Sequence, residues 1–323
     1  MMNYYIFGGS GFIGTHLINL LAQKFGGSNI YNLDIVENNH SGKSIFIYCD
    51  VRYEITLNIP VTENDIIFNF SAVHTTPGHP DHEYFETNIK GAENVTAFAE
   101  QFNIKKILFT SSIAPYGASE EMKTEETLPM PNTPYGISKF VAEKIHMVWQ
   151  AKAESERQLT VLRPGVVFGK GENGNFTRLY WGIKKKRFFY PGRKDTVKAC
   201  IYVKDLVNFM LYKISRDKKN IEIFNCAYEP AFTIEEISNA MMKATNMNRK
   251  IYKIPGGLLK FAAGIIGAMG GKSFGIHPDR VNKLMISTNI NGEKMKNSGY
   301  QFLYTFDEAL EDWFKDNDKR FLK

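Results

Sequence analysis

A short strand, a glycine-rich turn and a helix open the chain and constrain its fold more than any other stretch. Residues 4–7 are aromatic and β-branched, which predicts a buried strand. Gly8, Gly11 and Gly14 follow at three-residue intervals, and leucines at helical spacing then predict a helix over residues 15–24. The glycines therefore lie between a strand and the start of a helix.

Each of these glycines has a physical role in that position. Gly8 permits the tight turn out of the strand, Gly11 leaves room for a pyrophosphate to approach the backbone, and Gly14 lets the helix pack close to the sheet. The unpaired N–H groups and the positive dipole at the helix N-terminus then face the phosphates. A plain glycine-rich turn explains the same residues, so a dinucleotide site needs a second feature.

An acidic residue at the end of the second predicted strand supplies that feature. Residues 30–34 have the pattern of a strand that ends in Asp34, twenty residues after Gly14. A carboxylate there can accept hydrogen bonds from both ribose hydroxyls, and it would repel a 2′-phosphate. No Arg or Lys follows until Lys43. The sequence therefore favours NAD over NADP as the cofactor.

Strand and helix signals alternate through the first half of the chain. This alternation predicts an α/β fold, with a Rossmann-type doubly wound parallel sheet and helices on both faces. Ligands of such sheets bind beyond the carboxyl ends of the strands. Further strands are expected at residues 44–48, 65–70, 105–111, 159–163, 199–203 and 221–226, and helices at residues 81–102 and 134–153.

The second half of the chain has a different pattern. A glycine-rich loop at residues 169–174, followed later by mainly helical segments, indicates a smaller and discontinuous C-terminal domain. We expect residues 1–168 plus 197–226 to form the NAD-binding Rossmann domain. Residues 169–196 plus 227–323 are expected to form the substrate-binding domain.

Composition and charge argue against several classes of protein. The 323 residues carry a net charge of +6 with the basic residues spread out, which suggests anionic ligands and gives no reason to expect nucleic acid. The three cysteines, Cys49, Cys200 and Cys226, show no metal-ligand spacing, so we expect no metal site and free buried thiols in a reducing compartment. The sequence shows no signal-peptide pattern, so the expected location is the cytoplasm.

The longest apolar stretch is residues 258–270, which Lys260 and several glycines interrupt. This stretch is too short to span a bilayer, so no integral membrane span is expected. A packed helix is the preferred interpretation, and contact with a membrane surface or with another subunit are the alternatives.

Tyr135 and Lys139 are the sharpest chemical motif. They are four residues apart in a predicted helix and so share one of its faces. A phenol with its ordinary pKa of about 10 is a poor base at neutral pH. The Lys139 ammonium and the positive nicotinamide of bound NAD⁺ are expected to lower the pKa of Tyr135, which would make it a general base. An ordinary surface Tyr and Lys is the alternative.

Ser112 strengthens the catalytic interpretation. It follows the fifth predicted strand, twenty-three residues before Tyr135, where its hydroxyl could meet the tyrosine over a ligand. A serine there can bind the substrate oxygen and help to transfer its proton. A polar strand end is the simpler explanation of the same residue.

Taken together, these motifs resemble the extended short-chain dehydrogenase/reductase superfamily, in the branch of NAD-dependent nucleotide-sugar epimerases and dehydratases that includes UDP-galactose 4-epimerase-like proteins. The resemblance covers nearly the whole chain and is much more specific for fold and cofactor than for substrate. The motifs occur in the family's order: Gly8 to Gly14, Asp34, Asp50-Val51, Phe70-Ser71-Ala72, Asn88, Ser111-Ser112 through Tyr116-Gly117, Tyr135 and Lys139, Leu162-Arg163-Pro164, and Tyr202 to Asp205.

The resemblance implies further roles around the cofactor. The backbone amides of Phe12 and Ile13 would bind the pyrophosphate, and Lys139 would also hold the nicotinamide ribose. The other implied residues are Asp50 and Val51 beside the adenine, Ser71, Ala72 and His74 along the cofactor, Asn88 as their support, and Pro164 against the nicotinamide.

The residues after Ser112 narrow the reaction that the resemblance implies. An Asp-Glu pair follows the catalytic Ser or Thr in the family's 4,6-dehydratases, and a Cys follows it in fucose-synthase-like enzymes. Here residues 113–115 are Ile-Ala-Pro. This favours 4-epimerisation of a nucleoside-diphosphate sugar through a transient 4-keto intermediate. The resemblance also implies a homodimer through the helices near residues 81–103 and 134–153.

Departures from the family pattern concern the substrate. UDP-galactose 4-epimerase-like proteins have an Asn where this chain has Val166, and Lys198 stands nearest to the position of a family Arg. Asn175 matches a family substrate residue. Tyr190 could stack on a base or belong to the core, and Arg280 could contact a phosphate or form a surface ion pair.

Two other functions stay open beside the epimerase. One is an NAD(P)-dependent reductase or dehydrogenase of a keto-sugar or of a sterol-like alcohol or ketone, which Val166 and the apolar segment favour. The other is a non-catalytic NAD-binding regulator, against which the complete set of Ser112, Tyr135 and Lys139 argues.

Overall fold

A computed structural model describes residues 2–27, 29–37, 43–74, 78–216, 220–255, 257 and 285–323. The predictions for Arg280 and for residues 258–270 lie outside these described residues. No helix among the described residues combines the length and apolar character needed to cross a bilayer. Nor do the described residues hold a group of three or more His, Cys, Asp or Glu side chains suited to a metal ion.

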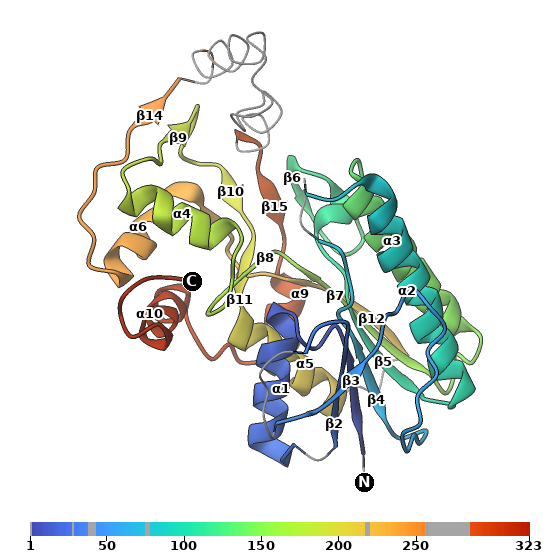
Figure 1. The fold of residues 1–323 in the computed structure, drawn as a ribbon. Coiled ribbons are helices and arrows are strands. Elements are labelled where there is room, and N and C mark those ends of the chain that lie inside the picture. Colours follow the sequence, from blue (N-terminus) through green and yellow to red (C-terminus); the bar gives the residue numbers. More distant parts are fainter. Residues whose placement is uncertain are drawn as a thin grey trace.

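A seven-stranded sheet forms the centre of the molecule (Figure 1). Its order is β12-β7-β5-β4-β1-β2-β3, and every neighbouring pair is parallel. The chain runs from β1 out to β3 and returns to β4 on the other side of β1, so the strand order reverses between β1 and β4. The strands are β1 (Tyr4–Phe7), β2 (Ile30–Asp34), β3 (Ile45–Tyr48), β4 (Ile66–Asn69), β5 (Lys106–Thr110), β7 (Gln158–Pro164) and β12 (Ile221–Cys226).

Alternate residues of β1 enter two different cores. Tyr4 and Ile6 belong to the core under α1 and α5, whereas Tyr5 and Phe7 belong to the core under α2 and α3. Figure 1 shows these two helix pairs on opposite faces of the sheet. Because both faces are buried, the strand is apolar at every position. The helices are α1 (Phe12–Phe25), α2 (Asp81–Gln101), α3 (Pro134–Ala151) and α5 (Val203–Arg216).

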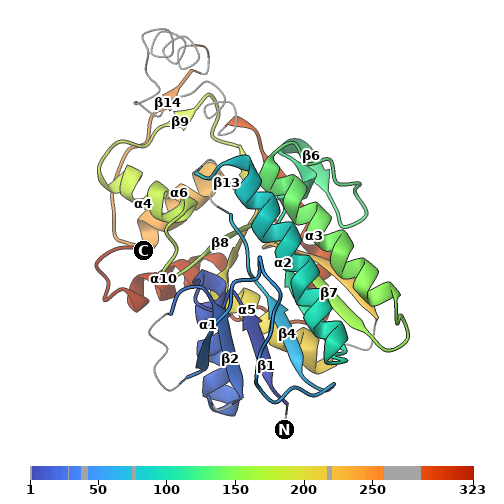
Figure 2. The same ribbon diagram turned by 45° about the vertical axis from the view of Figure 1, so that its right-hand side comes forward.

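Smaller elements, most of them from the second half of the chain, form a group beside this sheet (Figure 2). Several of them, including β8, α4, β11 and α10, share an aromatic core that contains Phe168, Phe176, Tyr202 and Trp313. One sheet has the order β13-β10-β15-β6, and two further pairs are β11-β8 and β14-β9. The elements are η1 (Ala114–Tyr116), β6 (Ser119–Lys123), β8 (Val166–Phe168), α4 (Asn175–Lys184), β9 (Tyr190–Pro191), β10 (Val197–Lys198), β11 (Cys200–Tyr202), β13 (Phe232–Thr233), α6 (Ile234–Ala244), β14 (Lys253–Ile254), β15 (Thr288–Ile290), α9 (Glu293–Lys296) and α10 (Phe306–Asp316).

The predicted Rossmann-type fold is confirmed, and the predicted elements agree with the structure to within a few residues at their ends. Strand β6 was not predicted, because its sequence Ser-Glu-Glu-Met-Lys is polar and lacks strand formers. It forms by pairing with β15, which is more than 160 residues away in sequence. Tertiary contacts therefore decide the conformation of this segment.

The three cysteines are free and buried, as predicted. Burial raises the pKa of the Cys49 thiol to about 11 and also raises the pKa values of Cys200 and Cys226. All three thiols therefore stay protonated and unreactive at neutral pH.

Candidate active site

The glycine turn after β1 is held by contacts that no larger residue could make. Gly8 has a φ of 77°, and a Cβ there would lie 2.7 Å from the backbone nitrogen of Ser71. A Cβ on Gly14 would lie 2.6 Å from the Cα of Gly9. The turn therefore contacts both the first turn of α1 and the segment that follows β4. This close packing brings the helix N-terminus to the carboxyl edge of the sheet.

The N-terminus of α1 is suited to an anion. Gly11 is its N-cap, no side chain caps the helix, and its first turn has no acidic residue. A Cβ on Gly11 would meet only the carbonyl oxygen of Gly8, at 3.3 Å. Phe12 and Ile13 are the first two helical residues, so their N–H groups belong to the unsatisfied end of the helix. The predicted pyrophosphate contacts of these residues fit this geometry.

Asp34 lies beside the same turn at the carboxyl end of β2. Its Oδ2 accepts a hydrogen bond from the backbone nitrogen of Ser10 at 3.0 Å, and its Oδ1 accepts one from Val36 at 3.2 Å. The side chain is only partly buried. In folds of this type, an acidic residue at the end of the second strand contacts the adenosine ribose of the dinucleotide. The prediction for Asp34 therefore fits the structure.

Replacing Asp34 by Asn should weaken NADH binding by about tenfold, because a charge-assisted hydrogen bond contributes about 1–1.5 kcal/mol more than a neutral one. The same change should narrow the preference for NADH over NADPH, because the carboxylate that repels the 2′-phosphate is lost. Equilibrium titration with each dinucleotide measures both effects. Glu37→Gln, which removes an exposed charge shortly after β2, is the matched control. An unchanged NADH-to-NADPH ratio in Asp34→Asn would contradict the assignment.

Asp50 and Val51 follow β3, where the adenine is expected. The Asp50 carboxylate accepts hydrogen bonds from the Arg52 guanidinium at 2.6–3.1 Å and from the Arg52 backbone at 3.0 Å. These bonds with Arg52 hold the pKa of Asp50 below its ordinary value. Val51 is buried, and a Cβ on Gly91 of α2 would lie 2.8 Å from its Cγ2. Asp50 and Val51 are therefore both held in place by contacts within the protein.

Asn88 of α2 supports the segment after β4. Its Oδ1 accepts from the Val73 nitrogen at 2.8 Å, and its Nδ2 donates to the Val73 oxygen at 3.1 Å and to the Ser138 hydroxyl at 2.8 Å. Ser71 and Ala72 are partly exposed on this segment and His74 is exposed. The supporting role expected of Asn88 therefore has a geometric basis, because its amide ties the segment to both α2 and α3.

Ser112 and Tyr135 are brought together by the packing of α3 against η1. Ser112 lies close enough to Tyr135 for its side chain to lower the pKa of the phenol. The start of α3 is set by Thr133, whose hydroxyl accepts a hydrogen bond from the Gly136 nitrogen at 3.1 Å, and by Pro134 at the first helical turn. A Cβ on Gly136 would lie 2.8 Å from the carbonyl oxygen of Ala114, so glycine permits this close approach.

Lys139 lies one turn further along α3 and is 3% exposed. Its ammonium donates to the carbonyl oxygen of Thr110 at 2.7 Å and lies 4.7 Å from the centre of the Phe109 ring. Burial lowers the pKa of Lys139 to about 7, against the opposing effect of the Glu143 carboxylate. The amine can therefore change its charge near neutral pH.

The expected effect of Lys139 on Tyr135 is not seen in the protein alone. Burial raises the pKa of Tyr135 above its ordinary value, and the hydrogen bond from Ser112 opposes this rise. Lys139 is not among the groups that shift this pKa, because an amine with a pKa of about 7 is already neutral at the high pH where the buried phenol titrates. The predicted lowering, which included the positive nicotinamide of bound NAD⁺, stays a prediction for the complex, whereas burial raises the pKa in the protein by itself. The prediction considered the charge of Lys139 but not the desolvation of the phenol.

Pro164 ends β7 beside the segment that carries Ser112. Its carbonyl accepts a hydrogen bond from the Ile113 nitrogen at 3.3 Å, directly after Ser112. It also pairs with Cys226 of β12. Val166 follows in β8 and is partly exposed. The implied position of Pro164 near the nicotinamide therefore agrees with its place at the same sheet edge as Ser112.

The predicted substrate residues are spread over the second group of elements. Asn175 is exposed at the start of α4, where its Oδ1 accepts from Arg178 at 3.0 Å. Lys198 is partly exposed in β10, and its ammonium donates to the Ile286 carbonyl at 2.7 Å. Burial lowers the pKa of Lys198 to about 8. Both side chains are accessible to a ligand.

Tyr190 differs from the other substrate candidates. It is 2% exposed in β9, and its ring packs against Phe188 with centroids 5.5 Å apart. This burial leaves little ring surface for stacking on a base, so the structure favours the core alternative for Tyr190.

Sequence reasoning missed a buried ion pair between α3, the helix of Tyr135 and Lys139, and β7. Glu143 of α3 and Arg163 of β7 form two hydrogen bonds, at 2.9 and 2.6 Å. Both side chains are almost completely buried. Two signals were available: Glu143 follows Lys139 at helical spacing, and Arg163 directly precedes Pro164. Two oppositely charged residues within apolar patterns indicate a buried pair.

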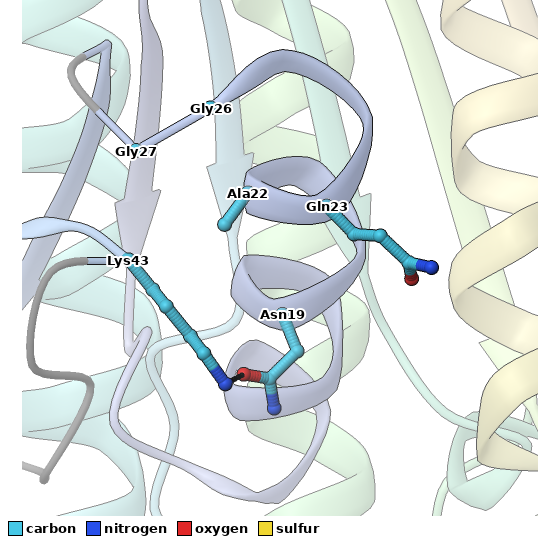
Figure 3. Close-up of a pocket in the computed structure, with 6 residues that line it drawn as sticks. All are labelled: Asn19, Ala22, Gln23, Gly26, Gly27 and Lys43. Atoms are coloured by element: carbon cyan, nitrogen blue, oxygen red, sulfur yellow. Dashed lines mark hydrogen bonds between the residues drawn. The ribbon is translucent and has the colours of Figure 1, made fainter.

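A pocket at the other end of α1 is separate from this site (Figure 3). The ammonium of Lys43 donates to Oδ1 of Asn19 across it at 2.9 Å. None of the predicted catalytic or cofactor residues lines it. Its lining residues are Asn19, Ala22, Gln23, Gly26, Gly27 and Lys43.

The structure places the glycine turn, the N-terminus of α1 and Asp34 at the carboxyl edge of a Rossmann-type sheet, and Ser112, Tyr135 and Lys139 lie at the same edge. Residues 4–227 match the model of the NAD dependent epimerase/dehydratase family, and the chain belongs to this family. The resemblance to extended short-chain dehydrogenase/reductases is thereby confirmed, and NAD is the cofactor of this enzyme.

Relatives with known activities are similar over most of their length. One relative, from Escherichia coli O157:H7, is 30% identical over 317 residues, which are 96% of this chain and 93% of that protein. Its name is N-acetyl-alpha-D-glucosaminyl-diphospho-ditrans,octacis-undecaprenol 4-epimerase. A UDP-glucose 4-epimerase of Lactobacillus helveticus is 24% identical over 277 residues, 76% of this chain and 83% of that protein.

Solved structures share the fold. MoeE5 in complex with UDP-glucuronic acid and NAD superposes with a TM-score of 0.74 and 20% identity, covering 98% of this chain and 99% of that one. The UDP-glucuronic acid 4-epimerase from Bacillus cereus in complex with NAD gives a TM-score of 0.73 and 18% identity, with the same coverage. At these identities the likeness establishes the fold.

Proposed function

We propose that the chain is an NAD-dependent 4-epimerase of a sugar that is joined to a diphosphate, with Tyr135 as the general base. The observation that carries the proposal is the placement of Ser112 beside Tyr135, with the buried Lys139 one turn away on the same helix. The full-length relative from Escherichia coli and the UDP-glucose 4-epimerase support the reaction type.

The chain's own residues supply the proton chemistry. The Tyr135 oxygen takes the proton of the sugar C4 hydroxyl, and Ser112 holds that hydroxyl in place by a hydrogen bond. Lys139, whose pKa is about 7, provides a positive charge near the phenol when it is protonated. The resulting 4-keto sugar rotates in the site so that it presents its other face. Tyr135 then returns the proton to the C4 oxygen of the epimer.

The cofactor residues described above fit NAD on three observations: the uncapped N-terminus of α1, the tight glycine turn and the carboxylate of Asp34. Bound NAD supplies the hydride acceptor and donor for C4. Gly11, Phe12 and Ile13 would hold its pyrophosphate, Asp34 its adenosine ribose, and Lys139 its second ribose.

Two groups are candidates for the part of the substrate that is attached to the far end of the diphosphate. A nucleoside is the prediction from the sequence and is supported by the nucleotide-sugar epimerases among the relatives. A polyprenyl chain is the alternative, which the name of the Escherichia coli relative supports. Lys198, partly exposed in β10, would contact the diphosphate in either case.

A substrate panel tests the proposal and separates the two candidates. The purified enzyme with NAD is incubated with UDP-, GDP- and dTDP-linked hexoses and N-acetylhexosamines, and separately with N-acetylglucosaminyl-diphospho-undecaprenol in detergent. NMR and mass spectrometry of the released sugar identify the C4 epimer. Conversion in only one of the two incubations shows whether the sugar diphosphate is attached to a nucleoside or to undecaprenol. No conversion in either incubation contradicts the proposal.

Reduction or dehydrogenation is a second candidate, because a GDP-6-deoxy-D-talose 4-dehydrogenase of Aggregatibacter actinomycetemcomitans is 30% identical over 236 residues, 70% of this chain. The same assays distinguish it through the absorbance of NADH. An epimerase forms product with no net change in NADH, whereas a dehydrogenase produces one NADH for each product.

A further inference from the structure

The ion pair of Glu143 and Arg163 is buried where charges are costly. The exposed fractions of the Glu143 and Arg163 side chains are 0% and 3%. Taking two charges out of water often costs as much free energy as their attraction returns, so such a pair is weak evidence for a role in stability. The guanidinium binds the carboxylate through two nitrogens, and this geometry fixes the carboxylate in one orientation.

The pair belongs to a network that joins the segments of the catalytic site. The Nη1 of Arg163 donates to the Tyr116 hydroxyl at 2.6 Å, and the guanidinium lies 4.9 Å from the centre of the Tyr116 ring. The same hydroxyl donates to Oδ1 of Asn225 in β12 at 2.9 Å. The network therefore links α3 to η1, β7 and β12. Ser112 lies two residues before η1, and Pro164 ends β7.

Glu143 is four residues after Lys139, so the two side chains share one face of α3. The surroundings of Lys139 are otherwise poor in negative charge. Phe109 and the Thr110 carbonyl lie against the ammonium from β5. His146, the next residue on that face of α3, has its pKa lowered to about 4 by burial and is neutral at neutral pH.

Three other titratable groups are near Lys139. His74 interacts electrostatically with it from the segment after β4, as a neutral or positive group. Tyr135 is uncharged, because burial raises its pKa. Arg163 is positive and lies behind Glu143. Among the described titratable groups that face Lys139, the Glu143 carboxylate is therefore the one whose charge favours the ammonium, in addition to the Thr110 carbonyl and the Phe109 ring.

We propose that Glu143 is a positioning residue for the reaction: Arg163 fixes its carboxylate one turn from Lys139, and that carboxylate keeps the Lys139 ammonium charged in water-poor surroundings. This inference rests on the role of Lys139 given under the proposed function. It predicts that loss of the Glu143 charge changes the protonation of Lys139 even when the fold is intact.

Glu143→Gln tests the inference, because glutamine keeps the size and one acceptor oxygen but removes the charge. Full-length protein carrying ¹³C-labelled lysine is titrated by NMR, and Lys139→Met assigns the signal. In the unmodified protein Lys139 should titrate near pH 7, its pKa being about 7. In Glu143→Gln the midpoint should fall by about one pH unit, the effect of removing one nearby opposite charge.

Activity as a function of pH provides the second readout. Lys139 loses its proton as pH rises, so the high-pH limb of kcat should move down by about the same one pH unit in Glu143→Gln. Glu143→Asp, which keeps the charge, should restore both the NMR midpoint and the high-pH limb toward those of the unmodified enzyme.

Glu222→Gln is the matched control. Glu222 of β12 pairs with Lys213 of α5, and the side chains of this pair are also about nine-tenths buried. This variant should lose stability but leave the Lys139 midpoint unchanged. If Glu143→Gln does not fold, Glu143→Gln with Arg163→Met removes both charges without leaving one unpaired, and the midpoint should still fall.

An unchanged Lys139 midpoint in a folded Glu143 variant overturns the inference. The same holds if Glu222→Gln shifts the midpoint as much as Glu143→Gln does. The NMR titration needs no substrate, so it also separates the two proposals. A shifted midpoint in an enzyme that converts no diphosphate sugar keeps the role of Glu143 and rejects the epimerase.

Discussion

Replacing Tyr135 by Phe is expected to reduce kcat by about 10²–10⁴-fold, the usual contribution of a general base. The phenol oxygen is the atom that Ser112 influences, whereas the ring packs beside Tyr84 with centroids 6.3 Å apart. Phenylalanine keeps this ring contact and removes only the oxygen. The fold and the affinity for NADH should therefore change little.

The measurement is steady-state turnover of the substrate identified by the panel, together with an NADH titration and a thermal unfolding curve. Tyr48→Phe, which changes an exposed tyrosine of β3, is the control and should retain full activity. A Tyr135→Phe enzyme that keeps more than about a tenth of its turnover would contradict the role of Tyr135 as base.

Replacing Gly14 by Ala is expected to lower the free energy of unfolding by about 1–2 kcal/mol, because the new Cβ would overpack the turn. The three atoms nearest to that Cβ are backbone atoms of Gly8 and Gly9, at 2.6–2.7 Å, so no side chain can move aside. Alanine is otherwise favoured over glycine in a helix by about 1 kcal/mol. A net loss of stability therefore shows that the contact with the turn decides the outcome.

Gly11→Ala makes the contrasting variant. Its Cβ would meet only the Gly8 carbonyl, at 3.3 Å, so stability should change by less than about 1 kcal/mol. NADH affinity should nevertheless fall by about tenfold or more, because the methyl group occupies space that the pyrophosphate needs. Chemical denaturation and NADH titration of both variants test this contrast. Equal NADH binding by Gly11→Ala and the unmodified enzyme would contradict a pyrophosphate at this helix end.

The NAD-binding half could be predicted from sequence because its signals are local. The glycines, the strand before them and Asp34 lie within about thirty residues, and each is required by backbone geometry or by charge. Tyr135 and Lys139 are likewise adjacent on one helical face. Such features depend little on contacts with distant parts of the chain, so their positions in the structure agree with the predictions.

Features that depend on distant contacts were missed or misjudged. The pKa of Tyr135 is raised by burial among side chains from several elements, and the Lys139 ammonium is held by a carbonyl of β5. The pairing of Glu143 with Arg163 joins residues 20 apart in sequence, from α3 and β7. None of these contacts follows from the periodicity of a single helix or strand.

The substrate side was predicted less well for a related reason. The loops and short strands of the second group have few periodic signals, and Tyr190 proved to be buried in its core. The roles of Asn175 and Lys198, the two-domain division and the homodimer through α2 and α3 stay predictions. The structure places α2 and α3 side by side on one face of the sheet, as that homodimer requires (Figure 1).

The inert state of the native cysteines makes the homodimer simple to test by site-directed cross-linking. Since all three thiols are buried with raised pKa values, one cysteine introduced at an exposed position will be the single accessible sulfhydryl. Val148, 58% exposed on α3, is a suitable position. Oxidative coupling of a Val148→Cys protein into covalent pairs would reveal whether two copies meet along this helix, without first removing any native cysteine.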